Sequence, residues 1–138
     1  MEAIISPLAQ TEFFLRGQNV QITDSFHLRE FECRCGACPY TLMSVDHVHR
    51  LQALRNLIKN PIRILSGYRC YARNLAVGGE KNSMHMYGLA TDVYAEGLEM
   101  GTLASLGREF EGVGIYDTWV HFDSRGFTAF WDKRKARA

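Results

Sequence analysis

The chain has 138 residues, of which 46% are hydrophobic and 22% are charged. This length and composition fit one compact globular domain and leave no room for a second sizeable module. The formal net charge of +1 argues against a general electrostatic attraction to nucleic acid. No stretch reaches the roughly 18 apolar residues of a membrane-spanning helix, so we expect no stable membrane insertion.

The N-terminus does not resemble a secretory signal. Glu2 stands where a basic region would be, and Ser6 and Pro7 soon interrupt the apolar pair Ile4-Ile5. We therefore expect the chain to be made in the cytoplasm without a signal peptide. The periodicity predicts an irregular arm over 1–25, a folded domain over 26–130, and a basic, solvated tail over 131–138.

The first half of the domain contains one clear helix. A brief helix is predicted over 27–32, before a cysteine-rich loop over 33–39. The clear helix covers 45–59, where apolar residues recur at spacings of three and four. Ser44 can accept hydrogen bonds from its first turn, and Pro61 stops it. A short strand over 62–65 and a short helix over 71–77 follow.

The second half alternates strands with a helix. We predict a strand over 89–94, a helix over 100–110, and a hairpin of strands 113–116 and 119–123 around Asp117-Thr118. This order predicts a single α+β domain, in which helices pack on one side of a small, mainly antiparallel sheet.

Three residues in this second half form a candidate metal site: His85, Asp92 and His121. Because side chains alternate along a strand, His121 shares a face with Asp123, and two neighbouring strands can present Asp92 and His121 to one pocket. His85 would reach in from the loop before Gly88. Two histidines and one carboxylate are a frequent ligand set for catalytic zinc, with a further position left for water. Each residue alone also has a purely structural interpretation.

Several segments carry a more specific resemblance. They are SMHMYGLATD at 83–92, VHFD at 120–123, SGYRC at 66–70, NLAVGG at 74–79 and GVGIY at 112–116. In order and spacing they resemble the zinc D-Ala-D-Ala carboxypeptidase and L-Ala-D-Glu endopeptidase family, whose fold is shared with the Hedgehog signalling domain. The closest subgroup in size resembles phage and prophage endolysins.

The resemblance implies roles for particular residues. It implies that His85, Asp92 and His121 bind zinc, and that Arg69 holds a substrate carboxylate or carbonyl oxygen, for which a guanidinium is well suited. Ser83 is expected to support the site by hydrogen bonding to substrate or to the zinc ligands.

The chain departs from the family pattern at the general base. Many relatives carry a glutamate three residues before the last zinc histidine, where this chain has Thr118. Asp117, at the hairpin tip, is the predicted base. Asp123 is the alternative, although it fits better as a partner that orients a zinc histidine or Arg69.

Four cysteines lie at Cys33, Cys35, Cys38 and Cys70. Their spacing is compatible with reduced thiols, with a disulfide between the loop and Cys70, or with a structural zinc site. The sequence does not decide among these three states.

These features predict a zinc-dependent peptidase, expected to be a monomer, that cuts the stem peptide of bacterial peptidoglycan. The compact chain favours an endolysin-like L-Ala-D-Glu endopeptidase that reaches the periplasm or cell wall by a holin-like or other non-classical route. Alternatives are a D-Ala-D-Ala carboxypeptidase and a non-catalytic, zinc-containing binding module.

Overall fold

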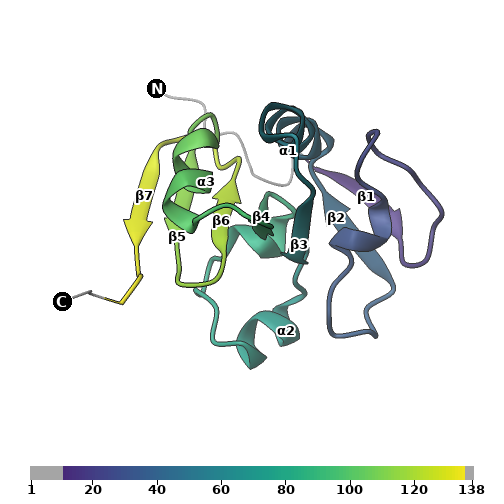
Figure 1. Cartoon of the computed structure of the whole chain (residues 1–138). Helices are drawn as coiled ribbons and strands as arrows, with labels where there is room; N and C mark the ends of the chain where they lie inside the picture. Colours follow the sequence, from purple (N-terminus) through teal and green to yellow (C-terminus); the bar gives the residue numbers. More distant parts are fainter. Residues whose placement is uncertain (1–10, 136–138) are drawn as a thin grey trace, which may run out of the picture.

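The computed structural model describes residues 11–135. Its elements, shown in Figure 1, are β1 (Glu12–Leu15), the 3-10 helix η2 (Leu28–Phe31), β2 (Tyr40–Met43), α1 (Val45–Ile58), β3 (Ile62–Ser66), α2 (Tyr71–Ala76), the 3-10 helix η3 (Met84–Tyr87), β4 (Ala90–Ala95), α3 (Met100–Leu106), β5 (Gly112–Ile115), β6 (Val120–Asp123) and β7 (Ala129–Asp132). No helix in this part of the chain is both long enough and apolar enough to cross a membrane.

The main sheet has five strands in the order β3-β4-β6-β5-β7. Neighbouring strands run antiparallel except β5 and β7, which are parallel. A second sheet pairs β1 with β2 and lies on the β3 side of the molecule, opposite β7 (Figure 1). The architecture confirms the predicted α+β class with a mainly antiparallel sheet.

One face of the main sheet packs on the hydrophobic core. Val120 and Phe122 of β6 are fully buried there, together with Leu51 of α1 and Leu103 of α3. Burial of one such side chain contributes about 1.5–3 kcal/mol, so this face stabilises the fold. The alternate residues of β6, His121 and Asp123, consequently belong to the opposite face.

The predicted start of the central helix at Val45 is confirmed, and its end lies one residue before the predicted Lys59. Ser44 Oγ accepts a hydrogen bond from the backbone N–H of His47 at 3.1 Å, as the capping argument expects. At the other end Lys59 adopts a left-handed backbone with φ of 58° and caps the helix, which ends at Ile58, three residues before Pro61. The predicted hairpin is also present, as β5 and β6.

Other sequence predictions are corrected by tertiary contacts. The part of the predicted irregular arm that the structure describes contains β1, which pairs with the unpredicted β2, and the Phe13 and Tyr40 rings stack at 5.4 Å. Residues 1–10 of that arm lie outside the described residues. β7 crosses the predicted boundary between domain and tail because its backbone pairs with β5.

The predicted helix over 100–110 is shorter than expected. It ends at Leu106, and Gly107 caps it with its N–H on the Leu103 carbonyl. A Cβ at position 107 would collide with the Phe122 ring. Close packing against β6 therefore requires glycine here, and glycine also favours the end of a helix.

Candidate active site

Asp92 and His121 face each other across two strands. They are register partners in the antiparallel pair β4–β6. The side chains of directly opposite residues lie about 4.5–5.5 Å apart at Cβ, so this pairing alone brings the carboxylate and the imidazole together. The sequence predicted this juxtaposition from strand alternation, and the register confirms it.

His85 reaches the same point from η3. Ser83 Oγ caps this short helix by accepting from the His85 backbone N–H at 3.2 Å. The helix then ends at Gly88, which has φ of 73° and lies against the Leu42 carbonyl, where a Cβ would not fit. Glycine thus permits the turn that sends the chain from His85 directly into β4.

The three candidate ligands present one atom each to a common centre. His85 Nε2 and His121 Nδ1 both lie 3.2 Å from Asp92 Oδ1. Donors bound at 2.0–2.1 Å to a tetrahedral zinc ion lie about 3.3 Å from one another, so these separations fit one ion. All three residues are buried, and their candidate ligand atoms lie within 4.8 Å of one another.

A second hydrogen bond orients each imidazole. His85 Nδ1 lies 2.7 Å from the carbonyl oxygen of Gly67, and His121 Nε2 lies 2.6 Å from Asp123 Oδ2. Each acceptor favours a proton on the nitrogen that faces it, which leaves the other nitrogen free to bind a metal. Burial lowers the pKa of His85, so this ring is neutral near pH 7, the form that binds metals.

Asp123 links His121 to an arginine. Its carboxylate receives two hydrogen bonds from Arg125, at 2.8 Å and 2.7 Å, and the side chain is fully buried. Burial opposes ionisation, but the hydrogen bonds from Arg125 and His121 outweigh it and hold the pKa of Asp123 well below its ordinary value. Asp123 is therefore a charged hydrogen-bond partner of His121, a contact that fits one of the two roles that the sequence left open.

Arg69 contacts the candidate metal site directly. Its Nη2 donates to Asp92 Oδ2 at 3.0 Å, while Nε and Nη1 donate to Ser66 and Asn74. Burial lowers the pKa of Arg69, and the neighbouring Asp92 opposes that effect. The guanidinium thus neutralises the carboxylate that would bind the metal, a contact that sequence reasoning did not specify.

A cavity of about 530 Å³ opens over these residues. Its lining includes Arg69, Val77, Gly78, Gly79, Glu80, Asn82, Ser83, Met84, His85, Asp92, Tyr116, Trp119, His121, Arg125, Trp131 and Lys133. Tyr116 and Trp119 stack at 4.6 Å, and Trp131 Nε1 donates to the Tyr116 hydroxyl at 2.9 Å. The volume suits a segment of peptide or a small ligand.

Sequence reasoning missed several residues of the cavity lining, including Arg125 and Trp131. Arg125 and Trp131 lie beyond the last recognised motif, and Trp131 fell in the predicted tail. A β-rich run at 129–132 after a glycine turn was the signal that could have identified β7. Its parallel pairing with β5 places Trp131 beside Gly114, where a Cβ would collide with the indole.

The structure does not bring Asp117, the predicted base, into the cavity lining. Its carboxylate is exposed at the β5–β6 turn and accepts from the Lys135 backbone N–H at 3.2 Å. The neighbours Tyr116 and Trp119 do line the cavity. Of the lining residues, only Asp92 and Glu80 carry carboxylates.

A comparison with protein families shows which family this chain belongs to. The family model described as peptidase M15 matches residues 24–123, a span that includes all three candidate ligands. The chain belongs to the peptidase M15 family. M15 peptidases depend on zinc, so this protein is a zinc metallopeptidase that acts on a peptide substrate. A comparison with curated proteins finds no match.

The donor set of this M15 peptidase is compatible with zinc. Two imidazoles and a carboxylate are a frequent ligand set of catalytic zinc, and the observed separations of the ligand atoms suit a tetrahedral ion. Three protein ligands leave the fourth coordination position for water.

Proposed function

We propose that this M15 peptidase hydrolyses an amide bond in the stem peptide of bacterial peptidoglycan, and that this bond joins L-Ala to D-Glu. The observation that carries the proposal is the convergence of His85, Asp92 and His121 beside a cavity of about 530 Å³. The aromatic wall of that cavity offers apolar contact, and its polar residues can contact peptide groups.

In this proposal His85 Nε2, Asp92 Oδ1 and His121 Nδ1 hold the zinc ion. Bound zinc would lower the pKa of a water molecule and polarise the scissile carbonyl. The chain's own contribution is orientation: Gly67 and Asp123 hold the two imidazoles, and Arg69 holds the Asp92 carboxylate.

Arg69 is also the proposed contact for the substrate. A guanidinium has five N–H donors, and three of its nitrogens each donate once to Ser66, Asn74 or Asp92. The remaining N–H groups can donate to a carbonyl oxygen of the peptide and stabilise the negative charge that develops there. Ser83, which also lines the cavity, supports the site through the His85 backbone.

We retain Asp117 as the proposed general base, with Glu80 as the second candidate because it lines the cavity. A base at Asp117 would have to exchange its contact with the Lys135 backbone for one with the attacking water. The proton it removes would later pass to the leaving amine.

Asp117→Asn and Glu80→Gln test this assignment. The variant that removes the base should keep its zinc and lose turnover by about 10²- to 10⁴-fold. Zinc analysis and steady-state kinetics on both variants measure the two properties separately. Full activity in Asp117→Asn with a loss in Glu80→Gln would transfer the role to Glu80.

The endopeptidase assignment is supported by the state of the arginines. A carboxypeptidase must bind a terminal carboxylate, yet the charges of Arg69 and Arg125 are each already balanced by a protein carboxylate. The N–H groups that Arg69 has left suit a neutral peptide carbonyl. Lys133 favours the alternative, D-Ala-D-Ala carboxypeptidase, because it lines the cavity and forms no ion pair within residues 11–135.

Mass analysis of digested muropeptides separates these activities. Wild type should release fragments cut between L-Ala and D-Glu, whereas His121→Ala should release none because a metal ligand is lost. Free D-Ala as the sole product would replace the endopeptidase with a carboxypeptidase. Stoichiometric zinc without cleavage of any muropeptide would favour a binding module.

We also propose that the protein acts in an endolysin-like way at the periplasm or cell wall. The compact α+β domain that residues 11–135 form is compatible with such an enzyme. Co-expression with a holin should lyse host cells, while neither protein alone should do so. Lysis by the enzyme alone would require a different route to the wall.

A further inference from the structure

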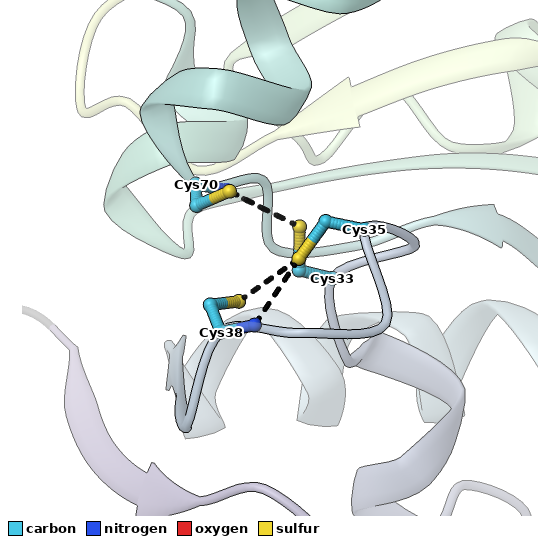
Figure 2. Close-up of side chains that lie close together, drawn as sticks. All are labelled: Cys33, Cys35, Cys38 and Cys70. Atoms are coloured by element: carbon cyan, nitrogen blue, oxygen red, sulfur yellow. Dashed lines mark hydrogen bonds between the residues drawn. The ribbon is translucent and has the colours of Figure 1, made fainter.

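Four cysteines from distant parts of the chain converge outside the candidate active site. Cys33, Cys35 and Cys38 come from the loop between η2 and β2, and Cys70 comes from the start of α2 (Figure 2). All four are free thiols, and their sulfur atoms lie within 4.8 Å of one another. Neither the family match nor the peptidase activity accounts for this cluster.

The spacing of the sulfurs suits a single metal ion. Cys33 Sγ lies 3.7 Å from Cys70 Sγ, and Cys35 Sγ lies 3.4 Å from Cys38 Sγ. Sulfurs bound at 2.3 Å to a tetrahedral zinc ion lie about 3.8 Å from one another. The cluster therefore has the dimensions of a four-thiolate zinc site.

Each sulfur also receives at least one N–H group, as a thiolate requires. The backbone N–H groups of Ala37 and Cys38 both point to Cys35 Sγ at 3.3 Å. The Cys70 N–H points to Cys33 Sγ at 3.4 Å, and the Arg73 N–H to Cys70 Sγ at 3.5 Å.

The fourth sulfur, that of Cys38, lies beside the guanidinium of Arg16. Arg16 Nη2 is 3.6 Å from Cys38 Sγ, and the same guanidinium donates to the carbonyl oxygens of Cys33 and Cys38. Four thiolates around a divalent ion carry a net negative charge, so a fixed guanidinium at this position stabilises the assembly. The loop thus surrounds its sulfur atoms with N–H donors and one cation.

We propose that Cys33, Cys35, Cys38 and Cys70 bind a second, structural zinc ion. Four protein ligands close the coordination shell, so this ion takes no part in hydrolysis. Binding replaces the thiol protons, which pass to solvent, and it joins two segments 37 residues apart in sequence.

The proposed site has a consequence for Arg69. Cys70 follows it directly, and the Arg69 backbone N–H donates to the His85 carbonyl at 3.1 Å. A zinc ion that holds Cys70 therefore also limits the movement of Arg69, whose guanidinium contacts Asp92.

Metal analysis of the full chain, purified under reducing conditions, tests the proposal. Wild type should contain about two zinc ions, and both His121→Ala and the double variant Cys35→Ser/Cys38→Ser should contain about one. Ala37→Ser, in the same loop, is the matched control and should keep both ions. A single zinc in wild type that His121→Ala removes would overturn the proposal.

Cobalt substitution in His121→Ala provides a second measurement that needs no cysteine variant to fold. The expected spectrum contains intense thiolate-to-cobalt charge-transfer bands in the near ultraviolet. Absence of these bands, or disulfides that persist under reducing conditions, would overturn the proposal. Loss of the cysteine site with retained peptidase zinc would leave the proposed function intact, so the two failures are distinguishable.

Discussion

At the scale of single residues, each histidine of the candidate site depends on a neighbour that is not itself a ligand. Asp123 is the clearest example, because it holds His121 on one side and Arg125 on the other while fully buried. Gly67 performs the same task for His85 with a backbone carbonyl, which substitution cannot remove. Asp123 is therefore the residue that tests orientation by mutation.

Asp123→Asn should weaken zinc binding or activity by about 10- to 100-fold, because the amide orients His121 less well and leaves Arg125 without its charged partner. Competition with a chelator measures the zinc affinity, and peptide hydrolysis measures kcat. Asp132→Asn is the matched control, since Asp132 is exposed and pairs with Arg134. Equal losses in both variants would contradict a specific role for Asp123.

His47 is a buried histidine whose two ring nitrogens both have hydroxyl partners. Its ring lies between the Ser124 hydroxyl at 2.8 Å and the Thr91 hydroxyl at 3.0 Å. Burial lowers the pKa of His47 from its ordinary value of 6.5 to about 3. As the pH falls, His47 in the unfolded chain therefore gains a proton before His47 in the folded protein does. The stabilisation of the folded state by the neutral His47 ring is complete above pH 6.5 and declines as the pH falls toward 3.

The His47 contribution to the free energy of unfolding should fall by about 2 kcal/mol between pH 7 and pH 5. Urea unfolding of the metal-free protein at both pH values measures this change. His47→Gln should show a smaller decrease than wild type, whereas His49→Gln, exposed on the same helix, should behave as wild type. Identical decreases in wild type and His47→Gln would contradict the prediction.

At the scale of elements, the glycines of β5 make room for residues of its neighbours. A Cβ at Gly112 would collide with the Asp123 carboxylate on β6, and a Cβ at Gly114 would collide with the Trp131 ring on β7. The GVGIY motif at 112–116, which resembled the family, thus has a steric function in this chain. Its two glycines make room for Asp123, the partner of His121, and for Trp131 in the aromatic wall of the cavity.

Gly112→Ala should displace Asp123 and reduce activity in the same way as Asp123→Asn, with an additional loss of about 1–3 kcal/mol of stability from overpacking. Thermal unfolding and hydrolysis assays measure the two effects. Gly101→Ala in α3 is the control, because its Cβ would meet only the flexible ends of Arg134 and Glu99. Normal activity in Gly112→Ala would show that Asp123 tolerates displacement.

β7 supplies one wall of the cavity through Trp131. Trp131→Phe removes the hydrogen bond to Tyr116, which is worth about 0.5–1.5 kcal/mol, and should raise KM by roughly 2- to 10-fold with little change in kcat. Steady-state kinetics measure this difference. Phe130→Leu, on the exposed face of the same strand, should leave KM unchanged. A fall in kcat alone would place Trp131 in the chemistry instead.

At the scale of the whole molecule, zinc should couple the segments that supply its ligands. His85, Asp92 and His121 come from η3, β4 and β6, so an ion bound to all three stabilises the folded state over the unfolded chain. At a free zinc concentration about 100 times Kd, the gain is about 2.7 kcal/mol.

Calorimetry with chelator and with added zinc measures this stabilisation. The Tm of His121→Ala should respond less to zinc than that of wild type, because one of the three ligands is absent. An equal increase in both proteins would show that the stabilising ion binds elsewhere, for example only at the four cysteines.

Much of the fold and the candidate metal centre followed from local pattern. Helical spacing and the Ser44 cap defined α1, and strand alternation put His121 and Asp123 on the face opposite Val120 and Phe122. These features depend on backbone periodicity, which neighbouring residues determine by themselves.

Only the tertiary structure decided the contacts between distant segments. The parallel pairing of β7 brought Trp131 to the cavity, and the convergence of the loop with α2 gathered the four cysteines. The physical reason is that such contacts depend on how whole elements pack. A sequence window does not contain that information, as the place of Trp131 in a paired strand and in the cavity wall illustrates.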